Sequence, residues 1–176
     1  MINLIRNVWH FVSGIAYKIV NAMLKVTGKS ISDAQWAALM QFVKFGLVGV
    51  MNTLIDYAAY FIALKIFEHF GLFGDKAYLP SSFIGFAVSV SNAFYWNDKY
   101  VFTKNAGEKR SRLQSYIKTV SSYAVTGLGL KTILLWLFIT VIGMSNVLAP
   151  VIIIFIIVPI NFLLNKLWAF RTKKPE

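Results

Sequence analysis

Two ionisable residues, Asp56 and Lys131, stand in the middle of long apolar stretches of this sequence. A charged side chain at the centre of a bilayer costs about 2.5–3.5 kcal/mol on insertion scales, so we expect neither residue to face lipid. Each lies halfway along its stretch, which predicts an ion pair at one depth between the first and third membrane helices. Such a pair either fixes the register of the helices or belongs to a path for a substrate or a proton.

Amides, hydroxyls and glycines recur at helical spacing around these two residues. The helix faces that this spacing predicts hold Asn52, Asp56 and Tyr60; Ser82, Gly85, Ser89 and Asn92; Ala124, Gly127 and Lys131; and Asn161 and Asn165. Small and amide side chains in this pattern either pack helices closely or line a polar path between them.

Three further cations stand beside aromatic residues where apolar stretches end, namely Lys99, Lys166 and Arg171. Cations and aromatic rings together suit the boundary between acyl chains and lipid phosphates. The same combination is typical of cations that only anchor a helix end at the membrane surface.

Sequence signatures of an enzyme or a metal site are absent. The chain has no Cys, and His10 and His69 stand far apart without a carboxylate at motif spacing. The sequence also has no nucleophile–base pairing and no Gly-rich phosphate loop. We therefore expect neither enzymatic activity nor a cofactor.

The composition is that of a membrane protein. Of the 176 residues, 57% are hydrophobic and only 14% are charged, against about 25% in a typical soluble domain. Apolar runs that can span about 30 Å of hydrocarbon cover residues 42–67, 79–96, 116–142 and 147–168. We predict an all-α membrane protein with four transmembrane helices.

The cations are distributed unevenly along the chain, which has a formal net charge of +11. Of the 18 Lys and Arg residues, all but Lys65, Lys76 and Lys131 fall in residues 1–44, in the connection 103–115 with its flanks, or after residue 165. The positive-inside rule then places both termini and this connection in the cytoplasm. We expect a multi-pass protein of the cytoplasmic membrane whose basic charge sets its orientation rather than binding nucleic acid.

The segment before the first apolar run, residues 1–32, has apolar residues every three or four positions and cations on other faces. It predicts an amphipathic helix lying in the membrane interface, or else a poorly ordered leader. Ser32 and Gln35 match a capping box, so the next helix should begin near Asp33. We divide the chain into a leader, 1–32, a four-helix domain, 33–172, and a basic cytoplasmic tail, 173–176.

The sequence repeats itself weakly. Residues 97–102 and 165–170 both read Asn, a charge within the next two positions, an aromatic, a small or branched aliphatic and Phe. Residues 42–44 also resemble residues 116–118. The pattern predicts two parallel two-helix repeats, unless the likeness reflects chance or shared interface chemistry.

Residues 42–56, together with the Asn-to-Phe endings at 97–102 and 165–170, resemble the GtrA-like family of small four-span membrane proteins. The likeness covers about residues 41–172. The leader departs from the family pattern, and so does Asp98, which stands where a cation is more usual. The resemblance implies a protein of cell-surface polysaccharide synthesis that flips a polyprenyl-phosphate-linked sugar from the cytoplasmic to the outer leaflet.

A substrate of that kind needs amides or hydroxyls and a cation along its path. For the substrate that the resemblance implies, the candidate binding residues are Asn52, Asp56, Asn92, Lys131, Asn161 and Asn165. The candidates for the phosphate headgroup are Lys99, Lys166 and Arg171. We expect a homo-oligomer, most simply a dimer, because four helices seldom enclose a sugar-sized cleft alone. The alternatives are an accessory protein that recruits or anchors a membrane glycosyltransferase, and a small four-span exporter, which the uneven cations disfavour.

Overall fold

The computed structural model describes residues 14–15, 17–18, 22, 32–104 and 107–172, and it confirms an all-helical fold for this part of the chain. The α-helices are α2 (Asp33–His69), α3 (Tyr78–Trp96), α4 (Arg112–Ala124), α5 (Lys131–Leu135) and α6 (Leu148–Leu164). A 3-10 turn, η1 (Gly74–Lys76), precedes α3. The π-helical turns are η2 (Asn97–Val101), η3 (Val125–Leu130), η4 (Trp136–Val141) and η5 (Asn165–Ala169).

The chain divides into two compact units, Met1–Val43 and Lys44–Glu176, and each is described by itself. In the first unit the predicted capping box is confirmed. The Ser32 hydroxyl accepts from the Gln35 backbone N–H at 3.3 Å, and the Gln35 side chain accepts from the Ser32 N–H at 3.0 Å. The predicted interfacial helix covers residues 1–32, most of which lie outside the described residues, and it stays a prediction.

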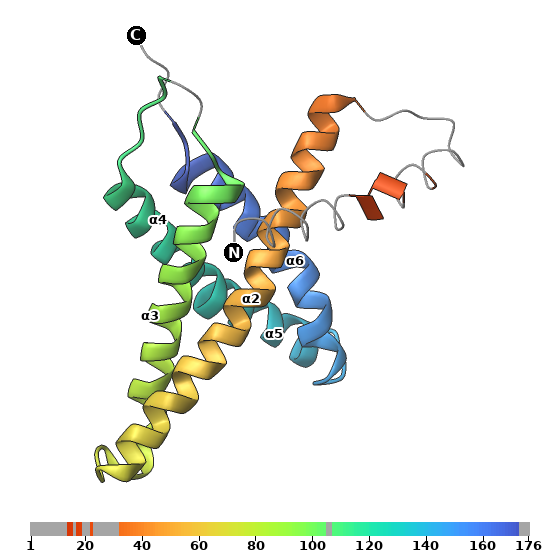
Figure 1. Ribbon diagram of the computed structural model, residues 1–176. Coiled ribbons are helices and arrows are strands. Elements are labelled where there is room, and N and C mark those ends of the chain that lie inside the picture. Colours follow the sequence, from red (N-terminus) through yellow and green to blue (C-terminus); the bar gives the residue numbers. More distant parts are fainter. Residues whose placement is uncertain (1–13, 16, 19–21, 23–31, 105–106, 173–176) are drawn as a thin grey trace. The chain divides into compact units, whose positions relative to one another are not determined.

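The second unit consists of two helical hairpins. The first hairpin, residues 44–102, runs down α2, turns after His69 and returns along α3 into η2 (Figure 1). Its turn contains three residues with positive φ, namely Gly71, Phe73 and Gly74. The second hairpin, residues 112–170, is the rod α4–η3–α5–η4 followed by α6 and η5. Its turn passes through Gly143, where φ is 76°.

The connection between the hairpins is shorter than the predicted 103–115. The Ser111 side chain accepts a hydrogen bond from the Gln114 N–H at 3.4 Å, and this N-cap starts α4 at Arg112. The connection therefore ends one turn earlier than its polar composition suggested.

Three helical rods in the described part of the chain are long and apolar enough to cross a membrane, so this is a multi-pass membrane protein. They are Asp33–His69 with 37 residues, Arg112–Val141 with 30 and Leu148–Ala169 with 22. The predicted span at 79–96 is helical as α3, but it falls outside this group. Three of its buried or half-buried positions are polar, Ser81, Ser89 and Asn92, which lowers its hydropathy.

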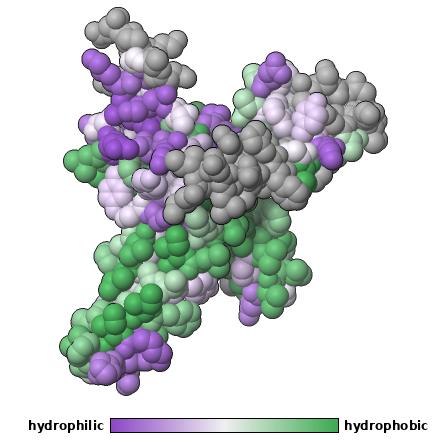
Figure 2. Space-filling view, viewed as in Figure 1, coloured by the Kyte–Doolittle hydropathy of each residue, from purple (hydrophilic) through white to green (hydrophobic). Residues whose placement is uncertain are grey.

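The side chains are arranged as expected for a protein embedded in a lipid bilayer, with large apolar side chains outside and small polar ones inside. Phe83, Leu128 and Phe155 are each more than 70% exposed. Among the largest fully buried side chains of the described residues, Ile153 alone is apolar, and the others are Asn97, Asn165, Thr119, Thr126, Ser81, Ser115 and Ser122. Figure 2 shows hydrophobic surface along the helices and hydrophilic residues gathered at the turn after α2 and around the connection between the hairpins. The buried polar side chains of the described residues therefore lie between the helices.

Candidate functional site

Helices α2 and α3 meet along faces close to the predicted ones, with Gly85 and Ser89 buried, but the predicted Ser82 is exposed and Ser81 is buried in its place. A Cβ atom added at Gly85 would lie 2.9 Å from the backbone oxygen of Asp56 and 3.3 Å from the Cβ atom of Tyr60. Glycine at this position therefore permits the close approach of the two backbones. The Ser89 hydroxyl donates a hydrogen bond to Asp56 Oδ1 at 3.3 Å.

Two asparagines continue this seam toward the end of α3. The helices run antiparallel, so Asn52, one turn before Asp56, lies near the level of Asn92. Asn52 is 9% exposed, and its Oδ1 atom has no hydrogen-bond partner. Asn92 accepts through Oδ1 from the Trp96 indole at 3.0 Å, whereas its Nδ2 atom is buried without a partner.

A third asparagine, Asn97, is completely buried at the first position of η2. The Tyr123 hydroxyl interacts with its side chain, but the geometry falls short of a hydrogen bond, and both amide atoms stay unpaired. An unpaired buried polar group costs about 1–3 kcal/mol, so these amides have the capacity to bind a water molecule or a polar ligand. We call this row the polar track: Asp56, Ser89, Asn52, Asn92 and Asn97.

The second hairpin pairs its buried amides internally. The Thr126 hydroxyl donates to Asn161 Oδ1 at 2.7 Å, and the Thr119 hydroxyl donates to Asn165 Oδ1 at 3.4 Å. Asn165 Nδ2 in turn donates to the backbone oxygen of Asn161 at 2.8 Å. The candidates Asn161 and Asn165 are therefore brought together, and the Oδ1 atoms of both and Nδ2 of Asn165 have hydrogen-bond partners within the bundle.

The hydroxyl face that holds these amides differs from the predicted one. The predicted face of the third span holds Ala124, Gly127 and Lys131, whereas the buried positions are Ser115, Thr119, Ser122 and Thr126. These four residues recur at intervals of four, three and four, which is the spacing of one helix face. The same periodicity used for the other spans would have found them.

The predicted ion pair between Asp56 and Lys131 is wrong. Ion pairs in the described part of the chain join Lys65 to Glu68 and two arginines to Asp98, and none involves Asp56. Lys131 is exposed at the first position of α5, directly after the π-helical turn η3. The buried positions of this rod, Thr119, Ser122 and Thr126, do not recur at position 131 at helical spacing, so Lys131 lies off the buried face.

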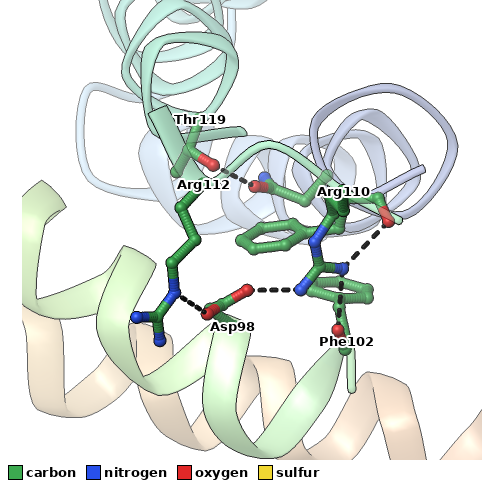
Figure 3. Close-up of polar contacts among 7 residues, drawn as sticks. Asp98, Phe102, Arg110, Arg112 and Thr119 are labelled. Carbon is green, nitrogen blue, oxygen red and sulfur yellow. Dashed lines mark hydrogen bonds and ion pairs between the residues drawn. The ribbon is translucent and has the colours of Figure 1, made fainter. Parts of the chain in front are cut away.

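The two Asn-to-Phe endings have the same structure and lie side by side. In each, the Phe N–H donates to the Asn backbone oxygen at 2.8 Å, from Phe102 to Asn97 and from Phe170 to Asn165. The Phe102 and Phe170 rings are stacked with their centroids 4.8 Å apart. Arg110 joins both endings, since its Nη1 donates to the backbone oxygens of Phe102 at 2.9 Å and Phe170 at 3.0 Å (Figure 3).

Arg110 also belongs to an ion-pair cluster around Asp98. Arg110 Nη2 contacts Asp98 Oδ1, and Arg112 Nε contacts Asp98 Oδ2 at 3.2 Å, so each carboxylate oxygen has its own guanidinium (Figure 3). The side chains of Arg110 and Asp98 are 3% and 8% exposed, whereas that of Arg112 is 75% exposed. From the sequence, the two arginines were predicted only to orient the chain in the membrane. Their position carried one signal, because Asp98 is an acid among cations at the end of an apolar stretch.

The three predicted headgroup cations take no part in the ion pairs of that cluster. Lys99 Nζ donates to the Tyr95 hydroxyl at 3.1 Å, and this hydrogen bond raises the pKa of Lys99 and keeps it charged. Lys166 Nζ lies 5.4 Å from the centroid of the Phe162 ring, and Arg171 is exposed. Each is placed like a cation at a membrane surface.

The described residues contain no group of three or more His, Asp or Glu side chains that would hold a metal ion. With its unpaired amides and buried guanidinium, this part of the protein is equipped to bind hydroxyl groups and an anion.

Comparison with known proteins gives one match. The family model described as GtrA/DPMS, transmembrane domain, matches residues 44–170. A comparison with curated proteins and a comparison with solved structures gave no match.

Proposed function

Because the chain belongs to the GtrA/DPMS transmembrane-domain family, we propose that it is a flippase for a polyprenyl-phosphate-linked monosaccharide. It carries the sugar from the cytoplasmic to the outer leaflet of the cytoplasmic membrane, where the sugar serves cell-surface polysaccharide synthesis or glycosylation. The polyprenyl tail stays in lipid during the transfer, so the protein has to shelter only the sugar and one phosphodiester charge.

The observation that carries this proposal is the polar track of the first hairpin. The sugar needs partners that both accept and donate hydrogen bonds, because each of its hydroxyl groups does both. Asn52 offers an unpaired oxygen and Asn92 an unpaired NH₂ group. An amide already buried without a partner has lost its water, so pairing it with a sugar hydroxyl costs little further desolvation.

The other candidate residues take secondary roles in this proposal. Asp56 accepts from sugar hydroxyls when the Ser89 hydroxyl, now 3.3 Å away, turns to the ligand. Asn161 and Asn165 hold the second hairpin together and position the track. Lys131, which is exposed within a membrane span, meets the substrate phosphate or is covered by a second copy of the chain.

The proposed topology has α3 as a fourth crossing, with both termini and the connection between the hairpins in the cytoplasm. The distribution of Lys and Arg supports this orientation. A reporter fused after Gly107 and another at the C-terminus should therefore report the same side of the membrane. We propose a homodimer as the working form, which native mass spectrometry in mild detergent would test.

Reconstitution tests the transport function. Purified protein is placed in liposomes that contain short-chain polyprenyl-phosphate monosaccharides. These lipids carry a fluorescent group at the sugar end, far from the polyprenyl tail. A membrane-impermeant reductant bleaches only the outer leaflet, so flipping appears as loss of the protected fraction. We expect flipping by the wild type and strong loss in the double variant Asn52→Leu with Asn92→Leu.

The matched control is Thr53→Val, a polar-to-apolar change on the exposed face of α2. Its hydroxyl bonds only to the Gly49 backbone oxygen of its own helix, at 3.1 Å, so flipping should persist. Equal protection in wild-type liposomes and empty liposomes would refute the flippase. It would leave the alternative, an accessory protein that recruits or anchors a membrane glycosyltransferase.

A further inference from the structure

Asp98 occupies an anion site made by two arginines. A guanidinium donates to each of its carboxylate oxygens, Arg110 to Oδ1 and Arg112 to Oδ2. Two guanidinium groups around one small oxyanion are also the arrangement that best binds a phosphate group. The site therefore has phosphate-binding geometry, filled by a side chain of the protein itself.

Arg110 is unusual for a cation that serves only to hold the fold. Only 3% of its side chain is exposed, yet its Nε atom has no hydrogen-bond partner. A planar guanidinium with an unused buried donor has capacity for one more acceptor. The carboxylate of Asp98 offers two oxygens, and the second of these is bound to Arg112.

Arg112 is 75% exposed whereas the Asp98 side chain is 8% exposed, so an incoming anion meets the Arg112 guanidinium first. The exchange is balanced in charge, because a phosphodiester and a carboxylate each carry one negative charge. Asp98 directly follows Asn97, the last member of the polar track, in the turn η2.

We propose that Asp98 is an internal substitute for the substrate phosphate. The phosphodiester of the lipid-linked sugar displaces the Asp98 carboxylate from Arg110 and Arg112 when it enters. Arg110 keeps its bonds to the Phe102 and Phe170 oxygens, so the bound phosphate is linked to both hairpins at once. This inference takes from the proposed function only the identity of the ligand as a phosphodiester.

Binding of simple phosphates to the full-length protein in detergent tests this site without a transport assay. The probes are dibutyl phosphate, a phosphodiester monoanion; tributyl phosphate, which has no charge; and inorganic phosphate. Calorimetric titration should show binding of dibutyl phosphate to the wild type and no binding of tributyl phosphate. Weaker binding of inorganic phosphate supports a lipid phosphodiester, whereas equal or tighter binding overturns that assignment in favour of free phosphate.

Two variants locate the binding. Asp98→Asn removes the competing carboxylate and should raise the affinity for dibutyl phosphate by about tenfold, with a rise in unfolding temperature when the probe is added. Arg112→Gln keeps the buried Arg110–Asp98 pair and should lower the affinity at least about fivefold, even if the first variant does not fold. The control Lys109→Gln removes an exposed cation from the same connection and should change the affinity less than about twofold.

The two proposals fail in different ways. Equal affinity of wild type and Arg112→Gln for dibutyl phosphate, or equal loss in Lys109→Gln, would overturn the internal-substitute proposal even if liposomes flip the lipid-linked sugar. Specific binding with no flipping would support the anion site and refute the flippase.

Discussion

Each hairpin ends in a π-helical turn, η2 in the first and η5 in the second, but the two helices of each hairpin are held together by different means. The first hairpin relies on close backbone approach at Gly85 and leaves amides of Asn52, Asn92 and Asn97 unpaired. The second hairpin leaves open space at Gly127 and is joined by hydrogen bonds from Thr119 and Thr126.

This difference separates support from binding. Hydrogen bonds between helices stabilise a membrane protein modestly and fix its register, as in the second hairpin. Unpaired buried amides do the opposite, because they lower stability unless a water molecule or a ligand pairs with them. The second hairpin is therefore the support and the first is the candidate binding element, with Arg110 as the joint between them.

The largest expected effect comes from the joint. Arg110→Met removes the cation from a nearly buried pair with Asp98 and leaves the Phe102 and Phe170 oxygens without their donor. We expect a loss of about 3–5 kcal/mol in unfolding free energy. Thermal unfolding in detergent measures it, and Arg112→Met is the control because its exposed pair should be worth about 0–1 kcal/mol. Similar losses in both variants would mean that the hairpins are not joined through Arg110.

The second prediction concerns close approach in the first hairpin. Gly85→Ala places a methyl group 2.9 Å from a backbone oxygen of α2, which cannot move without shifting the helix. Overpacking of this kind costs about 1–3 kcal/mol. Gly127→Ala meets nothing within 4 Å and should be neutral or slightly stabilising. If both variants have wild-type unfolding temperatures, the first hairpin does not depend on the Gly85 contact.

Sequence patterns were sufficient for the parts that depend on local chemistry. The capping box fixed the start of α2, and helical spacing placed Asp56 and Tyr60 opposite Gly85 and Ser89. Such features follow from residues a few positions apart, where the helical repeat is regular.

Other parts depended on contacts that spacing does not encode. Counting residues to the midpoint gave Asp56 and Lys131 the same depth, but depth does not fix the face of a helix, and Lys131 lies off the buried face of its rod. The burial of Arg110 arises because it binds the ends of both hairpins, at Phe102 and Phe170, which are far apart in sequence. Nothing within the connection itself distinguishes Arg110 from Lys109 or Arg112 before the hairpins meet.

The third prediction concerns replacement of the equivalent asparagines of the two hairpins, Asn97 and Asn165, by leucine. Asn165→Leu breaks one good hydrogen bond and one long one, at 2.8 and 3.4 Å, and should cost about 1–2 kcal/mol in unfolding free energy. Asn97→Leu removes two unpaired atoms together with the group that the Tyr123 hydroxyl interacts with, so it should cost less stability than Asn165→Leu, while it lowers flipping. Unfolding temperature and flipping are measured on both proteins.

An opposite result would reverse the roles of the hairpins. If Asn97→Leu destabilised the protein more than Asn165→Leu without affecting flipping, Asn97 would be a structural residue and the second hairpin the better candidate for binding.

The smallest expected effect is a coupling near zero between Asp56 and Lys131. With no ion pair between them, the effects of Asp56→Leu and Lys131→Met on unfolding free energy should add within about 0.3–0.5 kcal/mol. A buried pair would behave differently, because each single change strands the other charge and the double change restores stability. The wild type, both single variants and the double variant are compared by thermal unfolding and by flipping. Asp56→Leu should reduce flipping through loss of the polar track, and adding Lys131→Met should not rescue it. Rescue of stability in the double variant would show that the two residues pair in the membrane, either within one chain or between two copies, and the polar track would then extend from the first hairpin to the second.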